Sequence, residues 1–213
     1  MTINIQNLEQ IQSELIHYSK TKLLIVTKNQ SFQDIKILLE KGYCFFGENR
    51  VQEASLKFTD NLRIQFPNLQ LNLIGPLQSN KAKQALMLFD TIQSLDRKKI
   101  IDEISVLKKK IGQIRTKYFF LQVNIGMEQQ KSGIPPHEVS HLYDYAIKSN
   151  LNVIGLMCIP PYDNQSEKYF KDMKNLRDQI NPQLLLSMGM SSDYRQALLC
   201  GSNCIRIGSK IFH

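Results

Sequence analysis

The chain has 213 residues, of which 42% are hydrophobic and 22% charged, and its formal net charge is +8 at pH 7. This length suits one domain with a sizeable core, and the polar N-terminus argues against a secretory signal. No apolar run has the length of a membrane span, so we expect a globular, cytoplasmic protein without a membrane partner.

Hydrophobic periodicity predicts one N-terminal helix and then eight strands that alternate with helices. The strands are expected at residues 23–27, 43–47, 69–74, 91–95, 118–123, 153–157, 184–187 and 204–207. The helices are expected at residues 4–19, 31–41, 51–65, 80–89, 97–111, 136–149, 166–179 and 192–200. Most of these strands are apolar throughout, which is typical of parallel strands buried on both faces.

Eight such units favour the α/β class and a single (β/α)8 TIM barrel over residues 22–213. No helix is predicted after the last strand, so we expect the N-terminal helix to take its place against the barrel. An open, doubly wound sheet is the alternative fold. The segments that follow the strands should then gather on one rim, where the sites of such barrels lie.

Lys28 follows the first strand directly and is a candidate nucleophile. A lysine at the rim of an apolar interior loses hydration, which favours the neutral amine that forms a Schiff base with a carbonyl cofactor. Most lysines at such positions are solvated turn residues, so the other strand ends must support the assignment.

The last two strand ends indicate an anion site. Ser191 precedes a short predicted helix, and Gly208 and Ser209 follow the last strand, where phosphate groups bind in these barrels. Arg206 lies within that strand and must face either outward under a helix or inward toward a ligand. If it faces inward, its charge would disfavour protonation of a pyridine nitrogen beside it.

The remaining polar patterns carry less weight. Residues 137–141 match H-E-x-x-H, a zinc-binding pattern, but its two histidines lie opposite the apolar face of their predicted helix, so we expect no metal site. The basic clusters at 81–83, 97–99 and 108–110 are divided between two predicted helices and have no aromatic residues interleaved, so we expect no nucleic-acid partner. The four scattered cysteines are expected to be reduced core residues.

Seven blocks of the sequence resemble, in the same order, the YggS-type pyridoxal phosphate homeostasis proteins. They include VTK at 26–28, FGENRVQE at 46–53, IGPLQSNK at 74–81, KSG at 131–133, LSMGMS at 186–191 and IRIG at 205–208. The resemblance covers residues 23–212 and implies the barrel of the alanine racemase N-terminal domain. It further implies pyridoxal 5′-phosphate (PLP) bound as an aldimine.

The resemblance also implies roles for individual residues: Lys28 as the covalent anchor, Arg206 near the pyridine nitrogen, Ser191, Gly208 and Ser209 at the phosphate, Asn49 in the pocket wall and Ser187 nearby. Such proteins act in vitamin B6 and amino-acid homeostasis and have no established reaction. We expect a monomer without the second domain that gives racemases an opposing base. PLP-dependent apo-enzymes are the expected partners, and a small PLP racemase or lyase is the functional alternative.

Three positions depart from the family pattern. Gln30 stands where a second lysine is common, Arg50 where a tyrosine is common, and Asn72 where a histidine is common. Lys131 offers either a second amine or an ordinary solvated loop lysine.

Overall fold

Eight parallel strands form a closed barrel in chain order, and the last strand pairs with the first. The computed structural model describes residues 3–212, so His213, the last residue of the predicted barrel, lies outside the described residues. The strands are β1 (Lys22–Val26), β2 (Phe45–Glu48), β3 (Gln70–Leu73), β4 (Thr91–Leu95), β5 (Tyr118–Val123), β6 (Val153–Cys158), β7 (Leu185–Ser187) and β8 (Cys204–Ile207). The predicted TIM barrel is confirmed, and the open sheet is excluded.

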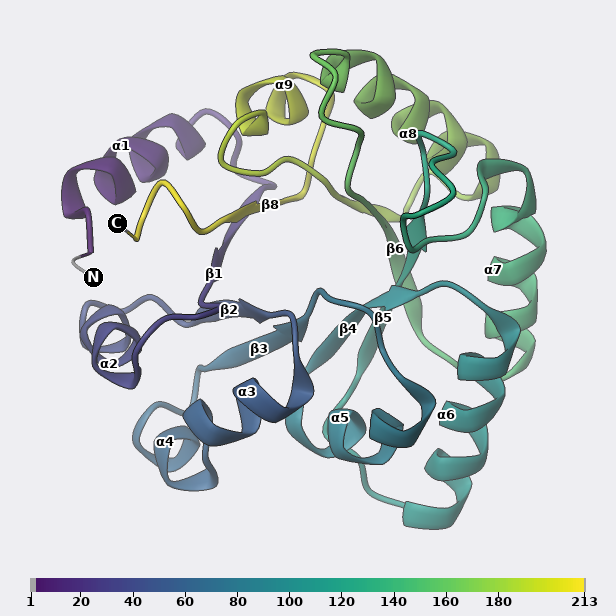
Figure 1. Ribbon diagram of the computed structural model, residues 1–213, viewed down its shortest axis with the longest axis horizontal. Coiled ribbons are helices and arrows are strands. Elements are labelled where there is room, and N and C mark those ends of the chain that lie inside the picture. Colours follow the sequence, from purple (N-terminus) through teal and green to yellow (C-terminus); the bar gives the residue numbers. More distant parts are fainter. Residues whose placement is uncertain (1–2, 213) are drawn as a thin grey trace.

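The helices form a ring around this barrel, which Figure 1 shows in a view through its centre. They are α1 (Ile5–Leu15), α2 (Phe32–Glu40), α3 (Val51–Lys57), α4 (Asp60–Gln65), α5 (Ala82–Leu88), α6 (Lys98–Ile111), α7 (Val139–Lys148), α8 (Ser166–Ile180) and α9 (Tyr194–Leu199), with short 3-10 turns η1 (Ser79–Lys81) and η2 (Pro136–Glu138). Among residues 3–212, no helix is both long enough and apolar enough to cross a membrane.

The N-terminal helix α1 completes the ring, as predicted. It lies between α9 and α2 in Figure 1 and buries Leu8, Ile11 and Leu15. The Glu14 carboxylate accepts hydrogen bonds from the Arg195 guanidinium at 2.6 and 3.0 Å, which ties α1 to α9. Residues 3 and 212, at the two ends of the described chain, form an antiparallel β-bridge.

The predicted helix over residues 51–65 is wrong, because the structure has two helices there. The first ends at Lys57, and Phe58 turns inward to pack against Phe46 with ring centroids 5.8 Å apart. Thr59 then takes an extended conformation and caps α4 by accepting a hydrogen bond from the amide of Leu62. A cap inside an apolar periodic run is sufficient to interrupt a helix.

Candidate functional site

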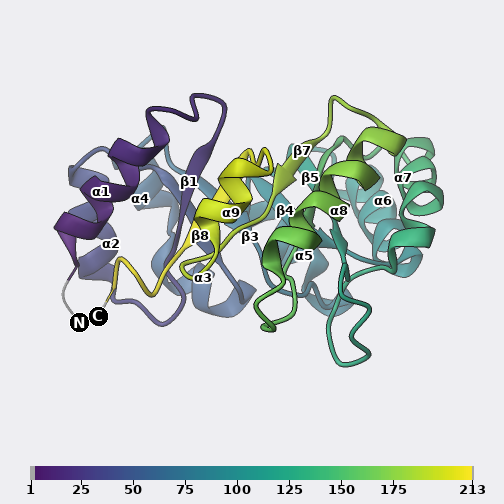
Figure 2. The ribbon, with the colours of Figure 1, turned by 90° about the horizontal axis from the view of Figure 1, so that it is seen from above.

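A cavity of about 1070 Å³ opens at the carboxyl ends of the strands. Its lining includes six of the seven predicted site residues: Lys28, Asn49, Ser191, Arg206, Gly208 and Ser209. The loops on this rim lie along the lower edge of Figure 2, where those after β5 and β6 project furthest. Such a volume is ample for a cofactor-sized ligand.

Lys28 lies two residues beyond the end of β1 and is exposed in this cavity. The expectation that the apolar rim dehydrates its side chain is therefore wrong for this structure. The reason is the position of the loop, since Thr27 is the last fully buried residue and the chain leaves the barrel at the next one. Asn29 has a left-handed backbone with φ of 61°, which turns the chain back toward α2.

Arg206 faces inward and is only 3% exposed. Its guanidinium donates to the Ser187 hydroxyl at 2.9 Å and to the Cys158 carbonyl at 2.7 Å. Burial lowers the pKa of Arg206, yet a guanidinium remains charged at neutral pH. The structure thus places a fixed cation in the floor of the cavity.

Ser187 does not line the cavity but lies fully buried beneath it, where it begins a polar chain across the barrel. Its hydroxyl donates to the Gln93 side-chain oxygen at 2.6 Å, and the Gln93 amide donates to the Asn72 side-chain oxygen at 3.0 Å. Asn72 donates in turn to the Phe46 carbonyl at 3.1 Å. Sequence reasoning missed Gln93, although a glutamine in the middle of a buried strand was a usable signal.

The two loops of the predicted phosphate site line the same cavity, but the helix behind Ser191 begins later than predicted. Asp193 accepts a hydrogen bond from the Met190 amide at 2.6 Å and forms a turn, so α9 begins only at Tyr194. Burial raises the pKa of Asp193, against the effect of this bond and of the Arg206 charge. Ser191 therefore belongs to a turn and not to the start of the helix.

Asn49 reaches the cavity from the loop after β2, and Gly75 of the next loop packs against its backbone. A Cβ atom added at Gly75 would lie 2.2 Å from the Asn49 carbonyl oxygen, so no other residue allows this approach. Gln30, which stands where a second lysine is common in the family, and Lys131, the candidate second amine, line the same cavity. The Lys131 amine also donates to the Pro160 carbonyl at 3.0 Å.

The H-E-x-x-H segment is exposed on the surface and is not part of the cavity lining. His137 and His141 are both exposed, as the helical periodicity predicted. Among the residues that the structure describes, no group of three or more His, Cys, Asp or Glu side chains is arranged to hold a metal ion.

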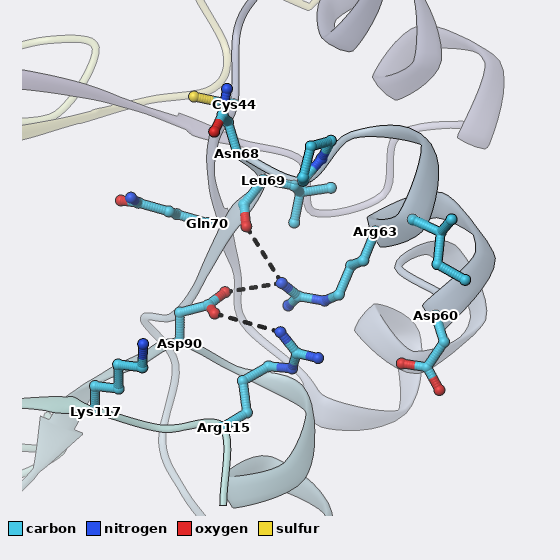
Figure 3. Close-up of a pocket in the computed structure, with 11 residues that line it drawn as sticks. Cys44, Asp60, Arg63, Asn68, Leu69, Gln70, Asp90, Arg115 and Lys117 are labelled. Carbon is cyan, nitrogen blue, oxygen red and sulfur yellow. Dashed lines mark hydrogen bonds and ion pairs between the residues drawn. The ribbon is translucent and has the colours of Figure 1, made fainter.

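A second cavity, shown in Figure 3, lies at the amino ends of β3–β5 and has a volume of about 860 Å³. Here Asp90 pairs with two guanidinium groups, that of Arg63 at 3.0 Å and that of Arg115 at 3.8 Å. Asp90 also accepts from the Leu71 amide at 2.8 Å. This arrangement joins the bottom of the barrel to α4, at the face of such barrels that contributes to stability rather than to chemistry.

Comparison with known proteins identifies the family. The model of the alanine racemase N-terminal domain matches residues 4–213. A pyridoxal phosphate homeostasis protein from Pasteurella multocida is 38% identical, with 100% of this chain and 97% of the relative covered, and one from Aquifex aeolicus is 34% identical, with 90% and 86% covered.

Solved structures agree. PipY of Synechococcus elongatus, determined with PLP bound, superimposes with a TM-score of 0.84 at 30% identity over 98% of this chain and 99% of PipY. An alanine racemase from Clostridium difficile shares the fold, with a TM-score of 0.73 at 15% identity, and this chain covers 57% of it. These matches confirm the predicted family: the chain belongs to the pyridoxal phosphate homeostasis protein family.

Proposed function

We propose that this protein holds PLP covalently on Lys28 and acts in intracellular PLP homeostasis rather than in catalysis. One observation carries the proposal: a single rim cavity contains both the Lys28 amine and the buried Arg206 guanidinium. The relatives named for PLP homeostasis and the PLP-bound structure of PipY support it.

The lining of the cavity fits a phosphorylated pyridine aldehyde. Its charged side chains, among the described residues, are all cationic: Lys28, Lys131, Arg206 and Lys210. Such a surface attracts a phosphate dianion, and it holds no carboxylate that would repel one. Among the residues that the structure describes, the same lining contains no histidine, tyrosine or carboxylate that could serve as a second acid–base group opposite Lys28.

Each residue then has a distinct task. The cofactor supplies an aldehyde, which condenses with the lysine amine to give a C=N bond with release of one water. Ser191 and Ser209 would bind the phosphate with their hydroxyls, and Gly208 would let the main chain approach it closely. Arg206 would keep the pyridine nitrogen unprotonated, which weakens the ring as an electron sink and favours storage over turnover. Asn49 would hold the wall of the pocket.

The covalent anchor can be tested directly. Protein incubated with PLP and reduced with borohydride should carry the pyridoxyl group on Lys28, located by mass spectrometry of its peptides. Lys28→Ala should lose the group, whereas the matched variant Lys131→Ala, from the same cavity, should keep it. An equal yield of adduct on another lysine in Lys28→Ala would refute the assignment.

The same preparation separates storage from turnover. Loaded protein incubated with a panel of amino acids should produce neither racemisation nor elimination, and turnover that vanished in Lys28→Ala would instead support the small-enzyme alternative. We also propose that the protein acts as a cytoplasmic monomer. Its recipients would be apo-enzymes that require PLP.

A further inference from the structure

A buried ionic cluster lies behind the loop that carries Lys28, and the proposed function does not use it. Its members are Glu48 at the end of β2 and Glu53 and Lys57 on α3, which we call the Lys57 cluster. The Lys57 amine donates to Glu48 at 3.0 Å and to Glu53 at 2.6 Å. Glu48 is fully buried, and the Lys57 side chain is 11% exposed.

The Lys57 cluster contacts the backbone on both sides of Lys28. Toward the N-terminus, the Lys57 amine donates to the Thr27 carbonyl at 2.7 Å. Toward the C-terminus, the Asn29 amide donates to the Glu53 carboxylate at 2.6 Å. The two peptide units that flank Lys28 are thus tied to one helix, α3, while the Lys28 side chain stays free to enter the cavity.

A further hydrogen bond joins the loop to Glu48. The Thr27 hydroxyl donates to Glu48 at 2.6 Å, through the same oxygen that accepts from Lys57. All three donors of the Lys57 ammonium therefore have acceptors, so its amine is not available to a carbonyl ligand. The two lysines therefore differ in role: Lys57 holds the loop, whereas the Lys28 side chain projects from it into the cavity.

Burial of the Lys57 cluster between α3 and the barrel has a desolvation cost that apolar side chains in the same space would not have. Two carboxylates share one ammonium, and burial raises the pKa of Glu48 in spite of its bonds to Thr27 and Lys57. Buried ion pairs are often no more stabilising than apolar residues of the same volume. What apolar residues cannot supply are the donor to Thr27 and the acceptor for Asn29.

We propose that Lys57 and Glu53 are positioning residues that fix the Lys28 backbone for covalent attachment of the cofactor. The inference rests on the proposed function, because it assumes that Lys28 is the anchor. Holding the backbone reduces the conformational freedom that the amine must lose as it reaches the aldehyde, and small misplacements of a reacting group slow such steps steeply. The cluster should therefore affect attachment more than non-covalent binding.

Three variants test the positioning role. Glu53→Ala removes the acceptor of the Asn29 amide at a side chain that is 23% exposed, so the fold should tolerate it. Glu53→Gln keeps a side-chain oxygen that can accept from the Asn29 amide, so it should restore the rate of attachment to Lys28. Glu167→Ala is the matched control, because Glu167 and Lys171 form an i,i+4 pair of the same 2.6 Å length on the exposed face of α8.

Two measurements separate positioning from general damage. The first is the rate of attachment to Lys28, trapped with borohydride, and the second is the affinity for pyridoxine 5′-phosphate, which has an alcohol in place of the aldehyde. We expect Glu53→Ala to slow attachment roughly tenfold to a hundredfold, with the alcohol bound within about twofold of wild type. Glu53→Gln and Glu167→Ala should attach the cofactor at the wild-type rate.

An unchanged attachment rate in Glu53→Ala would overturn the proposal, as would an equal loss of attachment rate and alcohol affinity. Failure of the proposed function has a different signature, since wild-type protein would then form no adduct or Lys28→Ala would retain it.

Discussion

Replacement of Ser187 by alanine should destabilise the protein far more than the loss of one hydroxyl suggests. The Ser187 oxygen is fully buried and joins two partners, accepting from Arg206 at 2.9 Å and donating to Gln93 at 2.6 Å. A hydrogen bond to a charged group contributes about 1.5–3 kcal/mol, and an unpaired buried polar atom costs about 1–3 kcal/mol. Ser187→Ala should therefore lower the free energy of unfolding by about 3–5 kcal/mol.

Ser94 provides the matched control, because it is also a serine buried in a barrel strand. Within residues 3–212, the Ser94 hydroxyl oxygen has no hydrogen-bond partner. Ser94→Ala should thus leave stability unchanged or raise it by about 1 kcal/mol. Urea unfolding followed by circular dichroism measures both variants, and equal losses in the two would refute the network argument.

Two further predictions concern the charged clusters. Burial holds the pKa of Glu48 above its usual value of 4.5, so its ionisation is disfavoured in the folded state. The free energy of unfolding of wild type minus that of Glu48→Gln should be greatest below pH 4.5 and should fall as pH rises through the raised pKa; urea titrations that give a constant difference up to pH 8 would contradict this. At the opposite rim, Arg63→Met removes a side chain bonded to Asp90 and to the Leu88 carbonyl at 2.7 Å. It should cost about 2–4 kcal/mol in urea unfolding and leave PLP affinity unchanged, and weaker PLP binding would show that the two rims are coupled.

The barrel was predictable because its evidence is local and repeated. Each strand is a short buried run between turn residues, and eight repeats leave few ways to cover both faces of a parallel sheet. The break at Phe58 was not predictable by the same means, because residues 51–65 keep a helical period across it. Phe58 packs on Phe46, a residue of another element, where α3 ends, and the Thr59 cap begins α4 directly after it.

The cavity was predictable for a different reason, which is topology. In a closed parallel barrel all carboxyl ends share one rim, so residues from Lys28 to Ser209 converge without any knowledge of side-chain contacts. Side-chain contacts between elements that are distant in sequence could not be predicted. Ser187 and Gln93 lie 94 positions apart, and nothing local to either residue shows that they pair.

Two polar systems, on opposite sides of the strand wall, hold the two groups that the cavity needs. The hydrogen-bond chain through Ser187 fixes Arg206 from inside the barrel, while Lys57 on α3 holds the loop of Lys28 from outside. Neither system places a carboxylate or an imidazole in the lining described by residues 3–212. The polar residues around the cavity therefore act on Lys28 and Arg206 by fixing their positions. Under the proposed function, these two groups would be the anchor and the cationic wall for PLP.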